Sequence, residues 1–458
     1  ILYAIIFSLI FLITTIFGEK IPYYENNITD YIMNLEDNPY KKEVLLHYDL
    51  GLNLLLFFSI YLLIKKNILD QIAIHFQIIW LVKSFISLFL IMVYENFFGL
   101  DQTRYFFFVI NDTSYAHHFG NLDKLFDIKN QTINFLLPLK LINFIFSDSW
   151  FAQKNFQNIL YFLSIFFFYK SIVKLEPKLN NNMSIIYFIG LLPSFLFFSS
   201  FITKDFLIIF FISILFFCLI SYEDSKNKAF SIIFLTISLF SIFMLRWWVG
   251  VGIFLVILFY LFYKNTIDKK IFKLNLFFLI IFLIMLGLYS VFYSNILQEI
   301  SFNLYTKIFE RIKVEHFYPP EHYDTLFISA GERHDLLYLY PIALFKTLFN
   351  PFILDILNFK LFIFVLENFL ILALLIFSFK NLLNKFNAKI LFLILIIITL
   401  SHIYIHIAYL NSGTTLRYSL QIKYFLLIYI VVMNYNFFIY LDKYIKSLFL
   451  NSYLNPKK

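Results

Sequence analysis

Apolar residues occur along this chain in long continuous runs that are separated by short polar links. Each run has about 15 to 25 residues, close to the roughly 20 residues that cross a bilayer as an α-helix. The mean hydropathy of +0.78 agrees with a membrane protein. The runs predict membrane spans at residues 1–17, 50–64, 72–95, 156–173, 183–199, 205–221, 229–245, 248–263, 272–294, 359–379, 390–410 and 416–441.

The runs favour helices over strands, because the strands of a membrane barrel alternate between apolar and polar residues over about 10 positions. Two shorter apolar stretches, 135–147 and 338–349, are too short to span a bilayer, so we expect re-entrant or interfacial helices there on the external face. Run 1–17 lacks an A-x-A-like cleavage site and is expected to be a retained helix. The predicted fold class is all-α: a polytopic integral membrane protein of about 12 transmembrane helices in one domain, residues 1–458.

The charges predict which side of the membrane each link faces. One side of the membrane holds the short links, the C-terminal tail and Lys170, with 18 lysines and 6 acidic residues. The other side holds 12 lysines, 5 arginines and 23 acidic residues. The positive-inside rule makes the first side cytoplasmic, so both termini are expected to be cytoplasmic in a multi-pass protein of the inner (cytoplasmic) membrane. The long loops 18–49, 96–155 and 295–358 are then external, and the active face is expected to be periplasmic.

The arginines are distributed differently from the lysines. All five are predicted to lie outside or at the external membrane face, against the positive-inside bias. A planar guanidinium binds phosphate or carboxylate through two parallel hydrogen bonds, whereas lysine acts as a point charge. The arginines therefore indicate anion binding, unless they pair with external carboxylates in loop packing. They are Arg104, Arg246, Arg311, Arg333 and Arg417.

The stretch "ISAGERHDLLYLYP" places four ionisable residues side by side in a chain of which only 14% is charged. Arg333 is a candidate for phosphate binding, and Asp335, with His334 as the alternative, is a candidate general base. Gly331 allows a sharp turn before the short apolar stretch that follows, which can anchor the loop at the membrane surface. The alternative is that this stretch is only a solvated loop tip.

Two further groups of charge lie on the predicted external face. Asp101 and Arg104 are three residues apart, so they share one helical face and act either as a base with a binding arginine or as a simple ion pair. Lys204 and Asp205 open the span that follows "LPSFLFFSSFIT". There Asp205 is a substrate-binding candidate or merely a favourable carboxylate at a helix N-terminus.

Three more substrate-binding candidates lie within or next to spans. Arg246 begins a tight hairpin beside two tryptophans that belong at a membrane interface in any case. Glu367 lies inside the span 359–379, where an unpaired carboxylate is costly, so it is expected to face protein or a water-filled cavity. Arg417 follows a flexible Ser-Gly turn at the start of the last span.

Several kinds of chemistry lack their motifs. No P-loop, dinucleotide-binding, zinc-protease or serine-hydrolase signature is present, so no cofactor and no metal site are expected. The single cysteine, Cys218, excludes a disulfide framework or a CxxC site within this chain. His402 and His406 share a helical face, but they are better explained as packed polar residues than as metal ligands.

The predicted spans, the enlarged external loops, the external arginines and the segment "LPSFLFFSSFITKD" resemble the Wzy-type polymerases of O-antigen or oligosaccharide repeat units. The chain resembles the GT-C membrane glycosyltransferases more loosely. The acidic pair that GT-C enzymes carry after the first span is absent, since "GEKIPYYENN" offers Glu19 and Glu25 six residues apart.

The resemblance implies glycosyl transfer from a polyprenyl-diphosphate-linked glycan in cell-surface polysaccharide biosynthesis. The lipid bilayer and that glycan are the expected partners, with a chain-length regulator or other polysaccharide-assembly proteins beside them and no nucleic acid. Catalysis then needs cations that hold the diphosphate and a base that deprotonates the acceptor. The resemblance assigns the cations to Arg246, Arg333 and Arg417, and the base to Asp335, Asp101 or His334.

Two other functions fit parts of the pattern. One is a GT-C glycosyltransferase that uses a polyprenyl-phosphate sugar. The other is a flippase or transporter of lipid-linked glycans, which also needs basic residues in a cavity. Transporters usually show matching halves with broken helices, and the sequence shows no such repeat, so the enzyme is favoured.

Overall fold

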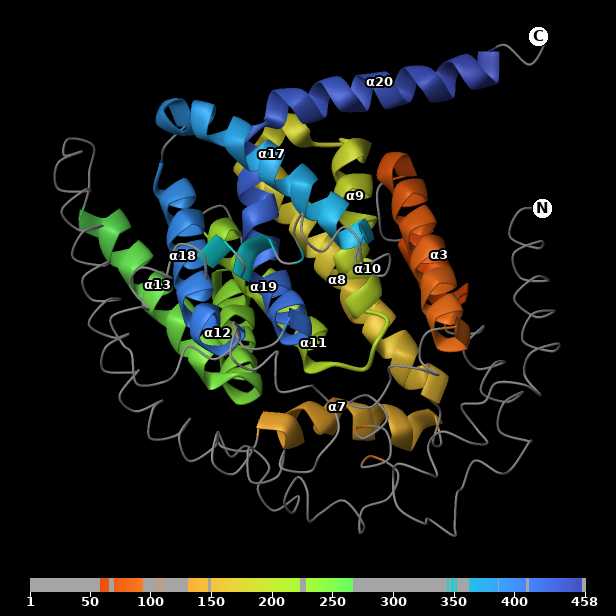
Figure 1. Cartoon of the computed structure of the whole chain (residues 1–458), viewed down its shortest axis with the longest axis vertical. Coiled ribbons are helices and arrows are strands. Elements are labelled where there is room, and N and C mark those ends of the chain that lie inside the picture. The colour runs from red at the N-terminus through yellow and green to blue at the C-terminus, as the bar shows by residue number, and fades with distance from the viewer. Residues whose placement is uncertain are drawn as a thin grey trace, which may run out of the picture. The chain divides into compact units, whose positions relative to one another are not determined.

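The structure, a computed structural model, describes residues 58–65, 70–93, 105, 109, 131–146, 150–222, 228–266, 344–345, 347–349, 351, 362–385, 387–408 and 412–454. Within these residues every regular element is a helix (Figure 1). The helices are α3 (Asp70–Val93), α7 (Gln131–Phe146), α8 (Trp150–Leu175), the 3-10 helix η4 (Pro177–Leu179), α9 (Met183–Gly190), α10 (Pro193–Phe198), α11 (Lys204–Ser221), α12 (Lys228–Leu245), α13 (Trp247–Thr266), α17 (Phe362–Lys385), α18 (Ala388–Ala408), α19 (Ser412–Met433) and α20 (Tyr435–Leu454).

Five helical segments in the described ranges are long and apolar enough to cross a bilayer: Ala152–Leu175, Lys204–Ser221, Lys228–Leu245, Phe362–Leu382 and Leu416–Met433. Large apolar side chains also remain exposed along α12 and α17, including Phe240 at 52% and Phe377 at 65%. Such surfaces suit contact with lipid. The chain is therefore a helical membrane protein, and the total of about 12 spans stays a prediction.

The predicted span 183–199 is not one continuous helix. It breaks between α9 and α10 at Leu191 and Leu192, whose ψ angles are 12° and 120°. Pro193 explains the break, because proline has no N–H with which to continue the ladder of α9 and disfavours a helical conformation at the residue before it. The pieces have 8 and 6 residues, each too short to span a bilayer.

The last predicted span, 416–441, is also wrong at its end. The helix ends at Met433, and α20 begins at Tyr435 as a separate helix. Asn434 lies at this junction and its side-chain amide donates to Ser378 Oγ at 2.8 Å and to the carbonyl of Leu374 at 3.0 Å. The polar side chain thereby ties the turn to α17, which fixes the point where the chain changes direction.

The predicted external loop 96–155 contains helices in its second half. The short helix expected at 135–147 is present as α7, although its re-entrant or interfacial position stays a prediction. The first six residues of α8 also fall within this loop. Loop 18–49 lies outside the described residues, as do most of loop 295–358 and of the short apolar stretch 338–349.

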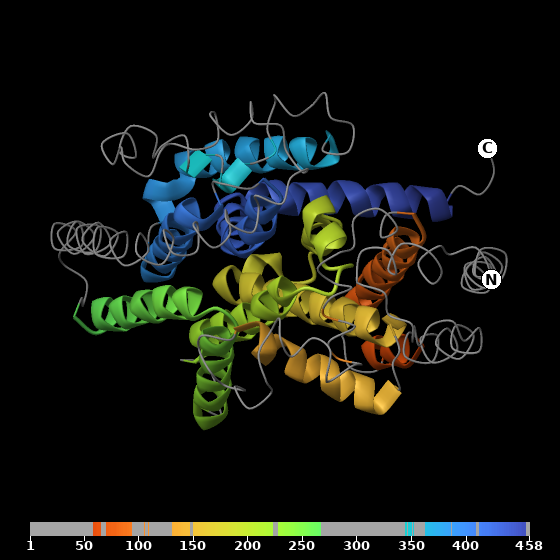
Figure 2. The ribbon, with the colours of Figure 1, turned by 60° about the horizontal axis from the view of Figure 1, so that its bottom comes forward.

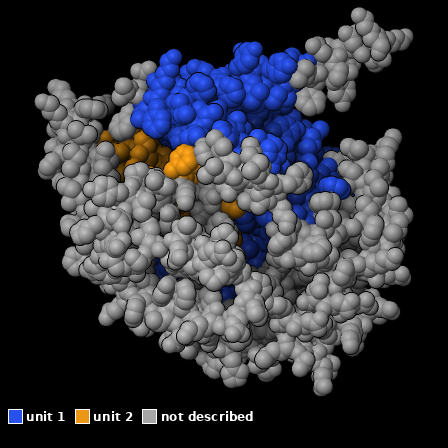
Figure 3. Space-filling view, viewed as in Figure 1, with its two compact units in different colours: residues 1–251, 351–385, 423–458 blue, residues 252–350, 386–422 orange. Residues whose placement is uncertain are grey.

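The chain divides into two compact units, which Figure 3 colours separately. The first comprises residues 1–251, 351–385 and 423–458, and the second comprises residues 252–350 and 386–422. Both are discontinuous in sequence. The single transmembrane domain expected from the sequence stays a prediction.

In the first unit, α8 and α11 pack side by side, α12 returns along α11, and α3 and α9 lie against α8 (Figures 1 and 2). Aromatic side chains fill the contact between α3 and α8, where the Phe76 ring lies 5.7 Å from that of Phe162. Gly190 permits a close approach of α9 to α3, since an added Cβ there would lie 2.7 Å from Ile79 Cδ1. This packing sets α3 beside both α9 and α10, and α8 beside α9, at the break between them.

In the second unit, α13 from Gly252 onward packs against α18. The rings of Tyr260 and Phe392 lie 5.2 Å apart, edge to face. A Cβ added at Gly252 would lie 2.6 Å from Ile403 Cδ1, so the glycine allows the two helices to approach closely. Tyr404 donates a hydrogen bond to Gln421 and stacks on Tyr418, which joins α18 to the start of α19.

Candidate functional site

Polar side chains from several helices of the first unit converge on residues 191–205, "LLPSFLFFSSFITKD", which we call the broken-helix segment. It contains the break, α10, the turn that follows and the first two residues of α11. Four basic side chains with at most 2% exposure lie around it and contact it directly or through one carboxylate. They are Lys83, Lys154, Arg246 and Lys423.

Glu367 on α17 binds the beginning of α10. Its carboxylate accepts hydrogen bonds from Ser194 N at 2.6 Å and Ser194 Oγ at 2.5 Å, and Lys423 Nζ lies 2.8 Å away. Leu192 at the N-cap has no side-chain acceptor, so a carboxylate from another helix satisfies one of the backbone N–H groups that a helix start exposes. Glu367 was expected to face protein or a water-filled cavity, and its contacts with Ser194 and Lys423 at 4% exposure place it against protein.

Arg246 and Asp205 form a second buried ion pair at the other end of the segment. Arg246 links α12 to α13, and its Nη2 lies 2.5 Å from Asp205 Oδ1, with both side chains fully buried. Asp205 lies in the first turn of α11, where the helix dipole also favours a carboxylate. The structure thus joins two candidates that are separated by 41 residues in the sequence.

Lys83 of α3 contacts the middle of the segment. Its Nζ donates to Ser200 Oγ at 2.5 Å, to Ser87 Oγ at 3.0 Å and to the carbonyl of Leu196 at 3.1 Å. Ser87 in turn donates to Asn158 Oδ1 at 2.7 Å, which continues the network to α8. A lysine with no exposed surface inside an apolar helix is costly, and such residues mark functional positions in membrane proteins.

Lys154 reaches the same turn from α8. Its Nζ donates to the carbonyl of Ser200 at 2.9 Å and lies 5.2 Å from the centre of the Phe201 ring. Lys83 and Lys154 therefore bind the side chain and the backbone of one serine. Two ammonium groups that contact one residue repel each other, and an anion near both would be favoured.

Two glutamines continue the polar face of α8 next to Lys154. Gln153 and Gln157 are both 0% exposed, and they lie four residues apart on one helical face. None of their four amide N and O atoms has a hydrogen-bond partner in the described part of the chain. Buried amides are normally hydrogen-bonded, so these atoms are suited to donate to and accept from a polar ligand such as a sugar hydroxyl.

The other candidates from the sequence make none of the contacts described above. Lys204 belongs to the broken-helix segment itself and is half-buried at the start of α11, while Arg417 is half-buried in the part of α19 that belongs to the second unit. Five candidates fall outside the described residues. They are Asp101, Arg104, Arg333, His334 and Asp335.

Sequence reasoning missed Lys83, Lys154 and Lys423 as site residues. Lys83 and Lys423 each lie inside an apolar run. A charged residue inside a predicted membrane span indicates a functional position, so the sequence could have pointed to both. Lys154 was harder to select from the sequence, because it lies in a stretch predicted to be an external loop, where lysines are common. No sequence feature marks Ser194 and Ser200, since their roles depend on helices distant in sequence.

Comparisons of the chain with protein-family models, curated proteins and solved structures find no match. Among the residues that the structure describes, no group of three or more His, Cys, Asp or Glu side chains comes together. The cluster is instead cationic, with four basic side chains and the two carboxylates Asp205 and Glu367.

Proposed function

We propose that the protein transfers or polymerises oligosaccharide units that are linked to polyprenyl diphosphate, at the periplasmic face of the inner membrane. The observation that supports this most directly is the convergence of buried basic side chains on the broken-helix segment. A lipid diphosphate is a multiply charged anion that stays in the bilayer, so a membrane-embedded protein that binds it needs cations at membrane depth.

The reaction that we propose is a displacement at the anomeric carbon of the donor. A hydroxyl oxygen of the acceptor forms a bond to that carbon, and the bond from the carbon to the diphosphate oxygen breaks. The acceptor proton passes to a general base, and the diphosphate leaves on its lipid. Cations that hold the developing negative charge lower the barrier, because they interact more strongly with the leaving diphosphate than with the intact donor.

Lys83 and Lys154 are the groups that we assign to the diphosphate, and Gln153 and Gln157 are assigned to sugar hydroxyls. Asp205 and Glu367 are already held by Arg246 and Lys423, so we assign them positioning roles for the segment. The general base is then sought in the loops, with Asp335 first and His334 and Asp101 as alternatives. Arg104, Arg333 and Arg417 remain candidates for phosphate binding.

A flippase or transporter of lipid-linked glycans is the second candidate, and one observation favours it. Transporters commonly bind substrate where a membrane helix is interrupted, and α9 and α10 form such an interruption. The two functions differ in their product, because a transporter moves the lipid unchanged whereas the enzyme forms a new glycosidic bond. A GT-C-like reaction with a polyprenyl-phosphate sugar differs in its donor, which carries one phosphate.

The first test is lipid binding by the purified protein in nanodiscs, with polyprenyl diphosphate and polyprenyl phosphate as the probes. Replacing Lys83 or Lys154 by Met removes one positive charge from the proposed diphosphate site, and we expect the Kd for polyprenyl diphosphate to rise about 10- to 100-fold. The matched control is Lys380→Met, an exposed lysine on α17, which should leave the Kd unchanged. Equal affinity in all of these variants would remove the cluster from the diphosphate site.

A further inference from the structure

The C-terminal helix α20 differs from the apolar helices that precede it. It has 20 residues, but Asp442, Lys443 and Lys446 lie near its middle, so it does not have the composition of a membrane span. It runs across the ends of α8 and α9 rather than alongside them, and its C-terminal half extends away from these helices (Figures 1 and 2).

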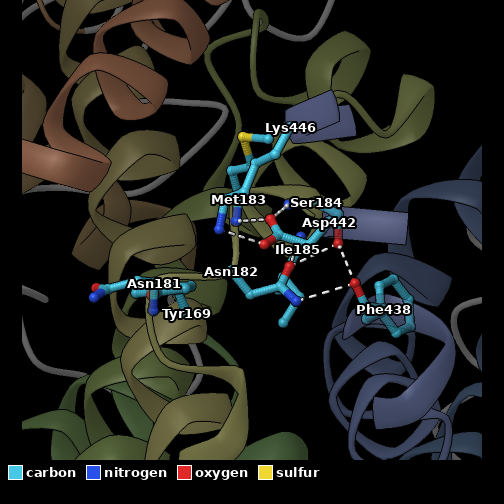
Figure 4. A network of polar contacts seen from close by, with 9 residues as sticks. All are labelled: Tyr169, Asn181, Asn182, Met183, Ser184, Ile185, Phe438, Asp442 and Lys446. Carbon is cyan, nitrogen blue, oxygen red and sulfur yellow. Dashed lines mark hydrogen bonds and ion pairs between the residues drawn. The ribbon is translucent and has the colours of Figure 1, made fainter. Parts of the chain in front are cut away.

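One face of α20 is fixed to the turn between α8 and α9 (Figure 4). Asp442 accepts hydrogen bonds from the backbone N–H groups of Met183 at 2.8 Å and Ser184 at 3.4 Å, which are at the start of α9. Asn182 Nδ2 and Ser184 Oγ both donate to the carbonyl of Phe438 at 3.0 Å. These bonds fix the rotation of α20 about its own axis, and therefore the direction of its other faces.

A second face of α20 carries exposed aromatic side chains. Phe437, Tyr440 and Tyr444 are 48%, 71% and 54% exposed. Their spacings of three and four residues place them on one stripe of the helix. Leaving large aromatic side chains in water costs free energy. An apolar or interfacial environment therefore suits this stripe better.

Basic residues lie between these two faces, since Lys443 is three residues from Tyr440 and Lys446 is four residues from Asp442. Lys443 is exposed, and Lys446 is 49% exposed while it pairs with Asp442 at 2.5 Å. Two lysines from other elements lie over the ring of Tyr435 at the start of α20: Lys178 at 5.1 Å and Lys385 at 3.6 Å from its centre. Four lysines therefore lie on α20 or against its first residue.

We propose that α20 lies in the headgroup region of the membrane, on the cytoplasmic side that the lysine distribution predicts for the C-terminus, and binds anionic phospholipids. Phe437, Tyr440 and Tyr444 enter the boundary between headgroups and acyl chains, and Lys443 and Lys446 bind the phosphates. An amphipathic helix with aromatic residues on one face and lysines beside them is the form that lies in a membrane interface, and anionic lipid supplies the complementary charge. The proposal does not depend on the enzymatic activity of the protein.

The single native cysteine allows a direct test of where each face of α20 lies. In a Cys218→Ser protein, nitroxide labels at Tyr440→Cys and at Lys446→Cys report on the aromatic stripe and on the side of the helix next to Asp442. In nanodiscs that contain phosphatidylglycerol, collisions of the label at position 440 with oxygen, which concentrates in lipid, should exceed those with a water-soluble nickel complex. The order should reverse at position 446.

Equal accessibility of both labels to the nickel complex would overturn the proposal, because α20 would then lie in water. Protection of position 440 from both oxygen and nickel would also overturn it and would indicate a protein surface, such as a second copy of the chain.

The preference for anionic lipid is tested by measuring the enrichment of phosphatidylglycerol over phosphatidylcholine around the protein. We expect it to fall at least about 2-fold in the Lys443→Gln, Lys446→Gln double variant. An unchanged enrichment would remove the anionic-lipid site.

Discussion

The ion pair between Glu367 and Lys423 gives the sharpest test of how the broken-helix segment is held. Both side chains are 0% exposed in the pair, and Glu367 also accepts two hydrogen bonds from Ser194. Glu367→Gln keeps the shape of the side chain but leaves the Lys423 ammonium buried beside a neutral amide. Removing one partner of a buried pair typically costs about 3–5 kcal/mol, because the remaining charge stays desolvated.

The reverse change, Lys423→Met, leaves the carboxylate buried and should destabilise the protein by a similar amount. The double variant removes both charges while the amide oxygen still accepts from Ser194 N. It should therefore be more stable than either single variant, with a coupling of at least about 2 kcal/mol between the two substitutions. The control is Lys446→Met, because the Lys446 side chain is 49% exposed and Asp442 keeps its hydrogen bonds from Met183 and Ser184, so the loss should stay at about 0–1 kcal/mol.

The measurement is the free energy of unfolding in mixed micelles of dodecyl maltoside and sodium dodecyl sulfate, followed by loss of helical circular dichroism. If both single variants lose less than about 1 kcal/mol, water reaches the pair and it behaves like a surface pair. If the effects of the two substitutions simply add, the side chains are not in contact. Either result would refute the description of this end of the segment.

Three further predictions follow from the structure and the sequence. Gly190→Ala should destabilise the protein by about 1–3 kcal/mol, because the new methyl group meets Ile79, and adding Ile79→Ala should recover part of this loss in the same unfolding assay. Asn181 has a φ of 59°, so Asn181→Ala should lower stability by about 1 kcal/mol whereas Asn181→Gly should not, and comparison of the two unfolding midpoints checks this. Reporter fusions after Asn130 and after Asp324 should show periplasmic activity, and cytoplasmic activity at either point would overturn the predicted sidedness.

The positions of most helices followed from the hydrophobic pattern alone. The predicted spans 205–221 and 229–245 differ from α11 and α12 by one residue at one end, because these runs are uniformly apolar and charged residues mark their starts. The pattern failed where a single residue decides the backbone. Pro193 interrupts a run that is apolar on both sides, and Asn434 ends a helix through contacts with α17 that no local pattern reveals.

The site was harder to predict than the fold. Glu367 was recognised because a carboxylate inside an apolar run requires a partner, but that partner, Lys423, is 56 residues away. Arg246 was selected as an anion-binding residue, yet its contact with Asp205 depends on how α11 and α12 pack as a hairpin. The serines of the broken-helix segment acquire their roles only from lysines on other helices, which composition does not specify.

The measurement that tests the proposed function most directly is product analysis after the purified protein is mixed in nanodiscs with a polyprenyl-diphosphate-linked oligosaccharide. Glycosyl transfer predicts that longer lipid-linked glycan and free polyprenyl diphosphate appear in equal amounts. Neither product should form with the Lys83→Met, Lys154→Met or Asp335→Asn variant, whereas the Lys380→Met variant should remain active. Movement of the intact lipid between leaflets without a new glycosidic bond would contradict the proposal and establish a transporter instead.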